Sequence, residues 1–170
     1  MPKPFTIIFC GTPAFAVPSL EALAADAAFD IRLVITQPDK PQGRKQMLTA
    51  PPVKLAAERL GIPVWQPENI NAEISKLEAG SSQLDYLIVV AYGKILKKQL
   101  LDLPTIAPIN VHASLLPRWR GASPIEHAIL AGDTDTGVTV QIMAERLDEG
   151  GILAQQKIAI DPRMVSLFWD

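Results

Sequence analysis

The sequence predicts an α/β fold in which the strands form a doubly wound, mostly parallel sheet. Short apolar runs of strand length alternate along the chain with segments whose apolar residues recur at helical spacing. Several of these runs are apolar without interruption, which is typical of parallel strands covered on both faces. The ligand crevice of such a sheet lies at the carboxyl ends of its strands.

The first predicted strand, Phe5–Cys10, is a near-continuous apolar run that Gly11-Thr12-Pro13 ends, and a helix is expected over Phe15–Ala25. The elements that follow are expected as a strand at Ile31–Thr36, a polar loop at Gln37–Thr49, a helix at Pro52–Leu60 that starts on proline, a strand at Ile62–Trp65, a helix at Ile70–Leu77 and a buried strand at Leu84–Ala91.

The second half of the chain continues with a strand at Ile109–His112 and a helix at Pro124–Leu130, for which Ser123 is the expected N-cap. Two further strands, Gly137–Met143 and Ile152–Ile160, alternate polar and apolar residues, which favours a position nearer the edge of the sheet. The sequence contains no internal repeat or linker, so one domain is expected.

The composition of the 170-residue chain gives little sign of its partners, because the net charge is only −2. Cys10 is the single cysteine and cannot form an internal disulfide, which suits a reducing cytoplasm. We expect Cys10 to be a small residue of the core. The longest strongly apolar stretch, Leu87–Ala91, is far shorter than the roughly 20 residues that span a bilayer. No leader and no membrane association are expected.

The segment Ile109–Gly121 reads INVHASLLPRWRG and carries the strongest functional signal. In a strand, residues two apart point to the same face, so Asn110 and His112 are expected side by side. A carboxamide donor beside an imidazole suits the stabilisation of negative charge that develops on a carbonyl oxygen. The other histidine, His127, is expected to face solvent on its helix. No metal site is expected, because neither a second histidine nor the cysteine lies at a suitable spacing from His112.

Asp148 lies in the predicted turn Glu145–Gly151, and the local sequence leaves two interpretations open. It is either an ordinary turn aspartate or a partner of His112 that favours the charged imidazolium. Gly11 supplies only one of the three glycines of a dinucleotide-binding loop, so we expect it to allow close helix–sheet packing.

The segment INVHASLLPRWRG resembles the active-site segment of the 10-formyltetrahydrofolate-dependent formyltransferases, which share Asn-x-His, Ser-Leu-Leu-Pro and a later aspartate. Further segments resemble the branch of this family that formylates methionyl-tRNA: Phe9–Pro18, Thr36–Pro41, Pro52–Lys54, Val89–Leu96 and Arg118–Ile125. The resemblance covers roughly residues 5 to 160 and implies a Rossmann-like topology.

The resemblance also implies roles for particular residues. The catalytic residues would be Asn110, His112 and Asp148. The folate co-substrate, 10-formyltetrahydrofolate, would contact the loop Ser114, Leu115, Leu116 and Pro117 and a pocket lined by Val90, Ala91, Tyr92, Gly93 and Ile95. Arg44 and Lys45 would contact the acceptor end of initiator methionyl-tRNA.

The sequence departs from the family pattern at two places. Gly151 stands where the family has a second aspartate, which leaves the rigidity of the catalytic loop open. The loop around Gly43–Met47 is less basic than usual, so a plain solvated loop is an alternative to a tRNA contact. The chain is expected to be a catalytic domain, residues 1–170, that lacks its C-terminal end and the tRNA-binding domain that follows in this family.

The expected activity is transfer of the formyl group to the α-amine of methionyl-initiator-tRNA in translation initiation, by a monomeric cytoplasmic enzyme. Two alternatives stay open. One is a related formyltransferase that acts on a small amine, such as glycinamide ribonucleotide or an amino sugar. The other is a folate-binding fragment without turnover.

Overall fold

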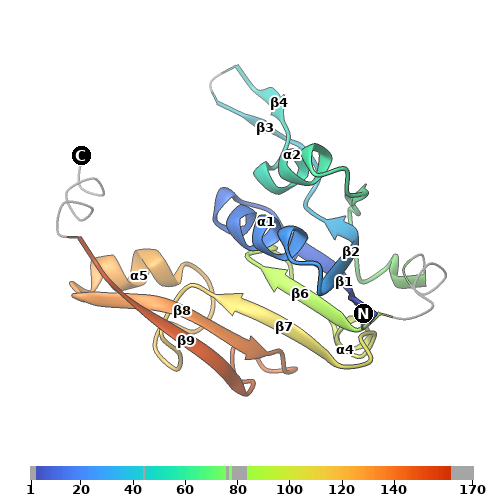
Figure 1. The fold of residues 1–170 in the computed structure, drawn as a ribbon. Coiled ribbons are helices and arrows are strands. Elements are labelled where there is room, and N and C mark those ends of the chain that lie inside the picture. The colour runs from blue at the N-terminus through green and yellow to red at the C-terminus, as the bar shows by residue number, and fades with distance from the viewer. Residues whose placement is uncertain (1–2, 44, 76, 78–83, 162–170) are drawn as a thin grey trace. The chain divides into compact units, whose positions relative to one another are not determined.

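The computed structural model describes residues 3–43, 45–75, 77 and 84–161. The chain divides into two compact units, Met1–Pro108 and Ile109–Asp170. Each unit is described by itself below, and Figure 1 gives the element labels.

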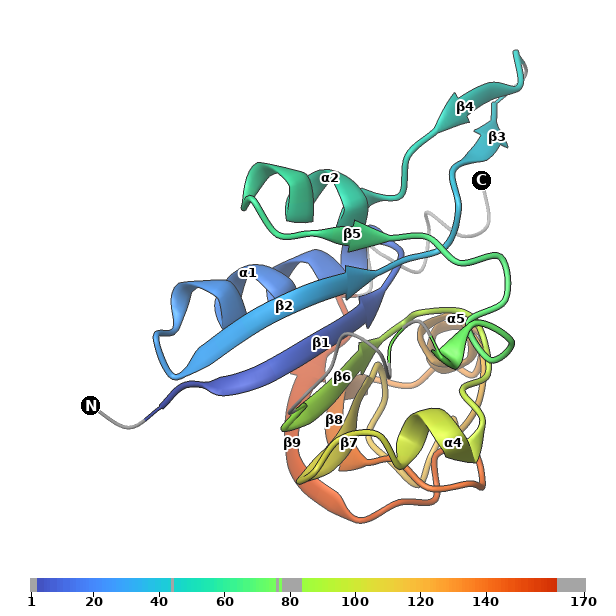
Figure 2. The ribbon, with the colours of Figure 1, turned by 90° about the vertical axis from the view of Figure 1, so that its right-hand side faces the viewer.

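The first unit is built on four parallel strands in the order β5-β2-β1-β6. Their bounds are β1 (Phe5–Gly11), β2 (Phe29–Ile35), β5 (Val64–Trp65) and β6 (Tyr86–Val90). Figure 2 shows β1 between its neighbours, and its residues from Ile7 to Gly11 are buried. A central parallel strand is covered on both faces, which explains its near-continuous apolar run. The predicted α/β class and mostly parallel sheet are confirmed.

Two helices of the first unit lie at the predicted positions, one was not predicted, and one predicted helix starts later than expected. A 3₁₀ turn (η1, Ala14–Ala16) precedes α1 (Val17–Ala25), and α2 (Pro52–Arg59) packs against α1. A short helix, α4 (Lys98–Leu101), was not predicted because its four residues are too few to show a helical period. Between Ile70 and Glu73, within the predicted helix Ile70–Leu77, the backbone forms turns or bends and becomes helical only at Ile74.

Gly11 has the predicted packing role. A Cβ atom on this residue would lie 2.8 Å from a ring carbon of Phe9 and 3.0 Å from the Cβ of Ala16. Any side chain here would push η1 away from the sheet, because real Cβ contacts are longer. Cys10, directly before it, is a fully buried core residue as predicted.

The prediction of a loop over Gln37–Thr49 was wrong, because this segment contains an antiparallel hairpin of β3 (Lys40–Gln42) and β4 (Met47–Thr49). The strands are only three residues long, and Pro41 within β3 is unusual for a strand, so the sequence carries a weak strand signal. Gly43 makes the turn with φ +69°, and its carbonyl accepts hydrogen bonds from the backbone and the side chain of Gln46. Figure 1 shows the hairpin projecting beyond α2.

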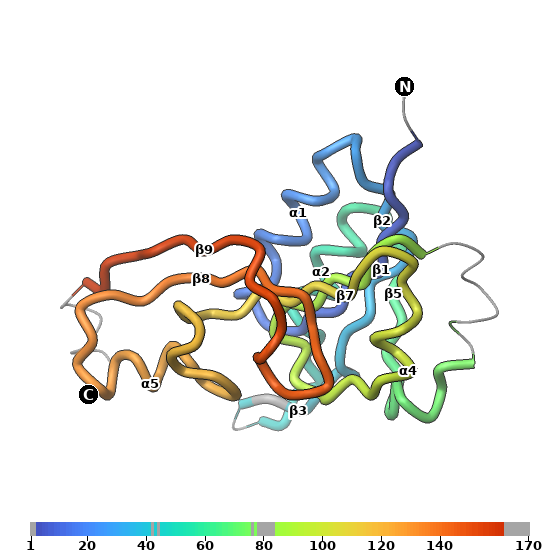
Figure 3. Tube along the Cα trace, turned by 90° about the horizontal axis from the view of Figure 1, so that it is seen from below, coloured from blue at the N-terminus to red at the C-terminus, as the bar shows by residue number. Residues whose placement is uncertain are grey.

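The second unit is antiparallel. β7 (Ala107–His112) starts at the boundary and pairs with β8 (Asp135–Ile142), and β8 pairs with β9 (Ile152–Ala159). Figure 3 shows β8 and β9 running side by side along their length. The helix α5 (Pro124–Leu130) packs on β8. Ser123 stands at the N-cap position as predicted, but with φ +55° its side chain makes no capping hydrogen bond.

The alternation along β8 places polar residues inside. Gly137, Thr139 and Gln141 are buried, whereas Ile142 is exposed. A side chain on Gly137 would collide with Leu115 and with the backbone oxygen of Gln156, so the backbones approach closely here. A buried face that carries threonine and glutamine is unusual for a core and marks a polar network.

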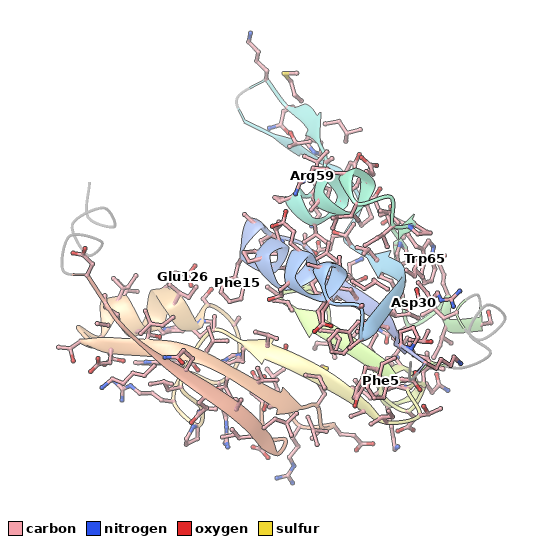
Figure 4. The ribbon with its side chains drawn as sticks, viewed as in Figure 1. Phe5, Phe15, Asp30, Arg59, Trp65 and Glu126 are labelled. Carbon is pink, nitrogen blue, oxygen red and sulfur yellow. The ribbon has the colours of Figure 1, made fainter. Side chains whose placement is uncertain are left out.

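Exposed side chains in Figure 4 include Phe5 at the start of β1, Arg59 on α2 and Glu126 on α5. Phe5 contacts the ring of Tyr86 edge-on at a centroid distance of 5.5 Å, and Arg59 pairs with Glu21 of α1. Over the described ranges, no helix is long and apolar enough to cross a membrane.

Two adjacent glycines at the end of the β8–β9 connection give a matched test of the fold. A Cβ on Gly150 would collide with the backbone carbonyl of Ile142, whereas a Cβ on Gly151 would meet nothing within 4 Å. We expect Gly150→Ala to lower the free energy of unfolding by about 1–3 kcal/mol, as overpacking does. Gly151→Ala should raise it by about 0.4–1 kcal/mol, because it restricts the unfolded chain. Urea unfolding of both variants measures this, and equal effects would contradict the described loop.

Candidate functional site

The carboxylate of Asp148 is the centre of the site in the second unit. Its Oδ1 accepts hydrogen bonds from Gln141 Nε2 at 2.8 Å and from Asn110 Nδ2 at 3.2 Å. Its Oδ2 accepts one from the backbone N–H of Gly121 at 2.8 Å. The side chain is 6% exposed, so these donors replace much of the water that a carboxylate requires.

Asp148 adopts a left-handed backbone conformation with φ +53°. Such a conformation costs roughly 1–2 kcal/mol for a residue with a Cβ atom, and aspartate is among the few residues that adopt it regularly. The hydrogen bonds to its carboxylate hold the side chain in the site despite this strain. Asp148 is therefore more than an ordinary turn aspartate, and the alternative in which it partners His112 is the one that the geometry favours.

His112 is buried at the end of β7, with its imidazole between two acceptors. Nε2 lies 2.8 Å from the carbonyl oxygen of Trp119. A carbonyl cannot donate, so Nε2 carries the proton whatever the charge of the ring. Nδ1 lies 3.6 Å from Asp148 Oδ1, which is an electrostatic contact rather than a hydrogen bond. Nδ1 therefore makes no hydrogen bond to Asp148, and the carboxylate lies on that side of the ring.

Asn110 lies on β7 directly opposite Gln141 of β8, and His112 lies opposite Thr139. Asn110 and His112 therefore share a face, as the spacing predicted. One N–H of the Asn110 carboxamide holds Asp148, and the amide nitrogen has a second hydrogen. The structure thus brings Asn110, His112 and Asp148 together in one polar cluster.

Trp119, whose carbonyl orients His112, is itself held in place by contacts of its side chain. The indole N–H of Trp119 donates to Asp133 Oδ2 at 2.7 Å, and the guanidinium of Arg118 donates to both oxygens of the same carboxylate. Arg118 also lies over the Trp119 ring, and His127 stacks on it at 5.5 Å. The hydrogen bonds from Arg118, and then from Trp119, hold the pKa of Asp133 below its usual value.

The predicted folate loop, Ser114 to Pro117, is held mainly by β8 and β9. The hydroxyl of Ser114 donates to the carbonyl of Arg118 at 2.6 Å, and its own carbonyl accepts from Thr139 at 2.6 Å. Leu115 packs against Gly137, and Leu116 is buried, with its carbonyl bound by Gln155. Pro117 is exposed. Pro117 therefore has the most exposed side chain of this loop, and Leu115 is half-buried.

The other predicted folate residues lie at the end of β6 and in the loop after it, in the first unit: Val90, Ala91, Tyr92, Gly93 and Ile95. The carbonyl of Tyr92 accepts hydrogen bonds from Thr12 Oγ1 and Gln37 Nε2, both at 2.9 Å. Its phenol is buried, which raises its pKa, and its hydroxyl has no hydrogen-bond partner among the described residues. Ile95 is 79% exposed. The loop is thus fixed through its backbone.

Of the two predicted tRNA contacts, Lys45 is exposed in the turn of the β3–β4 hairpin, and Arg44 lies outside the described residues. At the base of the hairpin, Asp39 accepts hydrogen bonds from Lys54 at 2.8 Å and from Gln66 at 2.7 Å. The hydrogen bonds from Lys54, and then from Gln66, lower the pKa of Asp39. This ion pair anchors the hairpin to α2.

Sequence reasoning did not identify Gln141, Trp119 and Gly121 as members of the site. The only available signal was at Gln141, where a strand pattern combines Thr139 and Gln141 on one face. The contacts of Trp119 and Gly121 are made by backbone groups, which any residue carries. Within the described part of the chain, no three His, Cys, Asp or Glu side chains gather as metal ligands would.

Comparison with known proteins relates this chain to a family. The family model described as formyl transferase matches residues 4–166. A curated methionyl-tRNA formyltransferase from Listeria innocua serovar 6a is 53% identical over 154 residues, which are 91% of this chain and 49% of that protein. The corresponding protein of Lysinibacillus sphaericus is 50% identical over 156 residues, 92% of this chain and 50% of its own length. The chain spans about half the length of these relatives.

Solved structures share the fold. Phosphoribosylglycinamide formyltransferase from Bacillus halodurans aligns with a TM-score of 0.73 and 24% identity, covering 96% of this chain and 85% of that one. A formyltetrahydrofolate deformylase from Pseudomonas syringae pv. tomato aligns with the same TM-score and identity over 99% of this chain and 56% of that one. The match to the family model over residues 4–166 establishes that the chain belongs to the formyl transferase family.

Proposed function

We propose that this chain is the catalytic domain of a methionyl-tRNA formyltransferase. It transfers the formyl group of 10-formyltetrahydrofolate to the α-amine of methionine on initiator tRNA, in translation initiation in the cytoplasm. The observation that carries this proposal is the buried cluster in which Asp148 is joined to Asn110 and lies 3.6 Å from His112. Relatives at about 50% identity that bear this enzyme's name support the choice of acceptor.

The cluster fits the chemistry of formyl transfer. The acceptor amine attacks the formyl carbon, a new C–N bond forms, and the carbonyl oxygen becomes a tetrahedral oxyanion. The second N–H of Asn110 and the positive charge of protonated His112 stabilise that oxygen. As the intermediate collapses, the bond to N10 of the folate breaks, the amine loses one proton and N10 gains one. Asp148 holds the site together and orders a water that relays this proton.

The β3–β4 hairpin is the proposed contact surface for the acceptor tRNA. It projects from the first unit and carries Lys45 exposed in its turn, followed by the exposed apolar residues Met47 and Leu48. Arg44 is the adjacent cation in the sequence. We assign Arg44 and Lys45 to the phosphates near the acceptor end of the tRNA, and the loops at Val90–Ile95 and Ser114–Pro117 to the folate.

The Asn110→Ala variant tests the proposed chemistry. Loss of one oxyanion donor typically lowers kcat by about 10²- to 10³-fold. We expect that loss in tetrahydrofolate release, with the Kd for the folate nearly unchanged, because the ground-state carbonyl needs the donor less. Gln156→Met on β9 serves as a control, since the Gln156 amide is exposed and bonds only the adjacent Lys157 carbonyl in the described structure. A wild-type kcat for Asn110→Ala would contradict the assignment.

The Lys45→Ala variant tests the tRNA contact. One phosphate contact contributes roughly 0.7 to 0.9 to the slope of log K against log salt. We therefore expect weaker binding of methionyl-tRNA at low salt and a slope that is smaller by about that amount, with folate binding unchanged. Lys157→Ala on β9 is the matched control for the loss of one positive charge. Equal slopes for Lys45→Ala and the wild type would leave the hairpin as a plain solvated loop.

A further inference from the structure

Gln141 occupies a position in which a glutamine side chain is unusual. It lies in the middle strand of the β7-β8-β9 ladder, opposite Asn110, and is only 1% exposed. Opposed residues of an antiparallel pair share one face, so two carboxamides lie next to each other beside Asp148. A buried polar side chain is costly unless its groups are paired.

Only one end of the Gln141 amide is paired within the described structure. Nε2 donates to Asp148 Oδ1 at 2.8 Å, whereas Oε1 is buried without a hydrogen-bond partner among the described residues. A methionine would fill a similar volume without burying an amide oxygen, so the glutamine carries a stability cost that packing does not require.

Gln141 and Asn110 share a single oxygen of Asp148, and their contacts differ. The bond from Gln141 is 2.8 Å long and the bond from Asn110 is 3.2 Å long. The shorter bond holds the carboxylate, with the backbone N–H of Gly121 on the other oxygen. Asn110 therefore makes the longer of the two bonds to this oxygen, and its amide nitrogen has a second hydrogen besides the one given to Asp148.

We propose that Gln141 is a positioning residue for formyl transfer. It anchors Asp148 Oδ1, so that Asn110 can turn its carboxamide toward the developing oxyanion without releasing the carboxylate. Because the amide of Gln141 is a neutral donor, Asp148 stays the single negative charge beside His112. This inference rests on the proposed function and adds to it a residue that acts through Asn110 and Asp148.

The test compares Gln141→Met with Gln156→Met in this chain, measured as tetrahydrofolate release from 10-formyltetrahydrofolate with methionyl-tRNA. We expect Gln141→Met to lower kcat about 10- to 100-fold, the usual cost of losing a partner that orients a reacting group. The KM for the folate should change little. The chain should stay folded, because removal of the unpaired amide oxygen offsets part of the lost hydrogen bond to Asp148. A kcat equal to that of the wild type, or a loss that follows lost stability, would overturn the inference.

A double variant separates positioning from an independent role. If Gln141 acts through Asn110, adding Gln141→Met to Asn110→Ala costs almost nothing further in kcat. Fully additive losses would overturn the inference.

Gln141→Glu supplies a second signature. Its ionised carboxylate would repel Asp148, whereas its protonated form can donate in place of the amide. Its kcat relative to the wild type should therefore rise as the pH falls, and a constant ratio would also overturn the inference. If the wild-type chain releases no tetrahydrofolate, the proposed function itself fails; activity in the wild type with no effect at Gln141 refutes only the positioning role.

Discussion

The polar cluster of the second unit depends on one carboxylate. Asp148 comes from the β8–β9 connection, yet its two oxygens bind donors on β7, on β8 and in the segment before α5. Its side chain is buried, and its Oδ1 lies 3.6 Å from the His112 Nδ1 atom. Without it, the carboxamides of Asn110 and Gln141 would lose their common acceptor, and the Gly121 N–H would lose its partner. Segments far apart in sequence are therefore held in one arrangement by hydrogen bonds to a charge, which are stronger than bonds between neutral groups.

Both units fix their loops in a similar way, through side chains that bind backbone carbonyls. Trp119 presents its carbonyl to His112 while its indole is held by Asp133. In the first unit, the carbonyl of Tyr92 is held by Thr12 and Gln37. Such clamps pre-organise a loop, so less ordering remains to be done when a ligand binds. The same loops contain two left-handed residues, Ala91 with φ +47° and Trp119 with φ +58°, and such strain persists only where the surrounding structure holds the backbone.

The fold was largely predictable because buried parallel strands leave a strong apolar signal, as in β1. The pair Asn110 and His112 was predictable from the two-residue period of a strand. The local sequence left Asp148 open between a turn residue and a partner of His112, and only the family resemblance favoured the catalytic role. The rest depends on contacts that the sequence does not encode locally. The β3–β4 hairpin is too short for a period, and the burial of Thr139 and Gln141 reverses the usual alternation, in which polar residues face water. The donor of Gly121 and the acceptor of Trp119 are backbone groups, so the residue type at these positions does not predict their contacts.

The central claim is that this cluster transfers a formyl group to an amine carried by tRNA. It is tested most directly by measuring tetrahydrofolate release from 10-formyltetrahydrofolate by this chain with methionyl-tRNA, with glycinamide ribonucleotide, with an amino sugar and with no acceptor. The account predicts release with methionyl-tRNA alone. Release driven by a small amine would identify a different acceptor class, and folate binding without release under any condition would contradict the assignment of catalysis to this site.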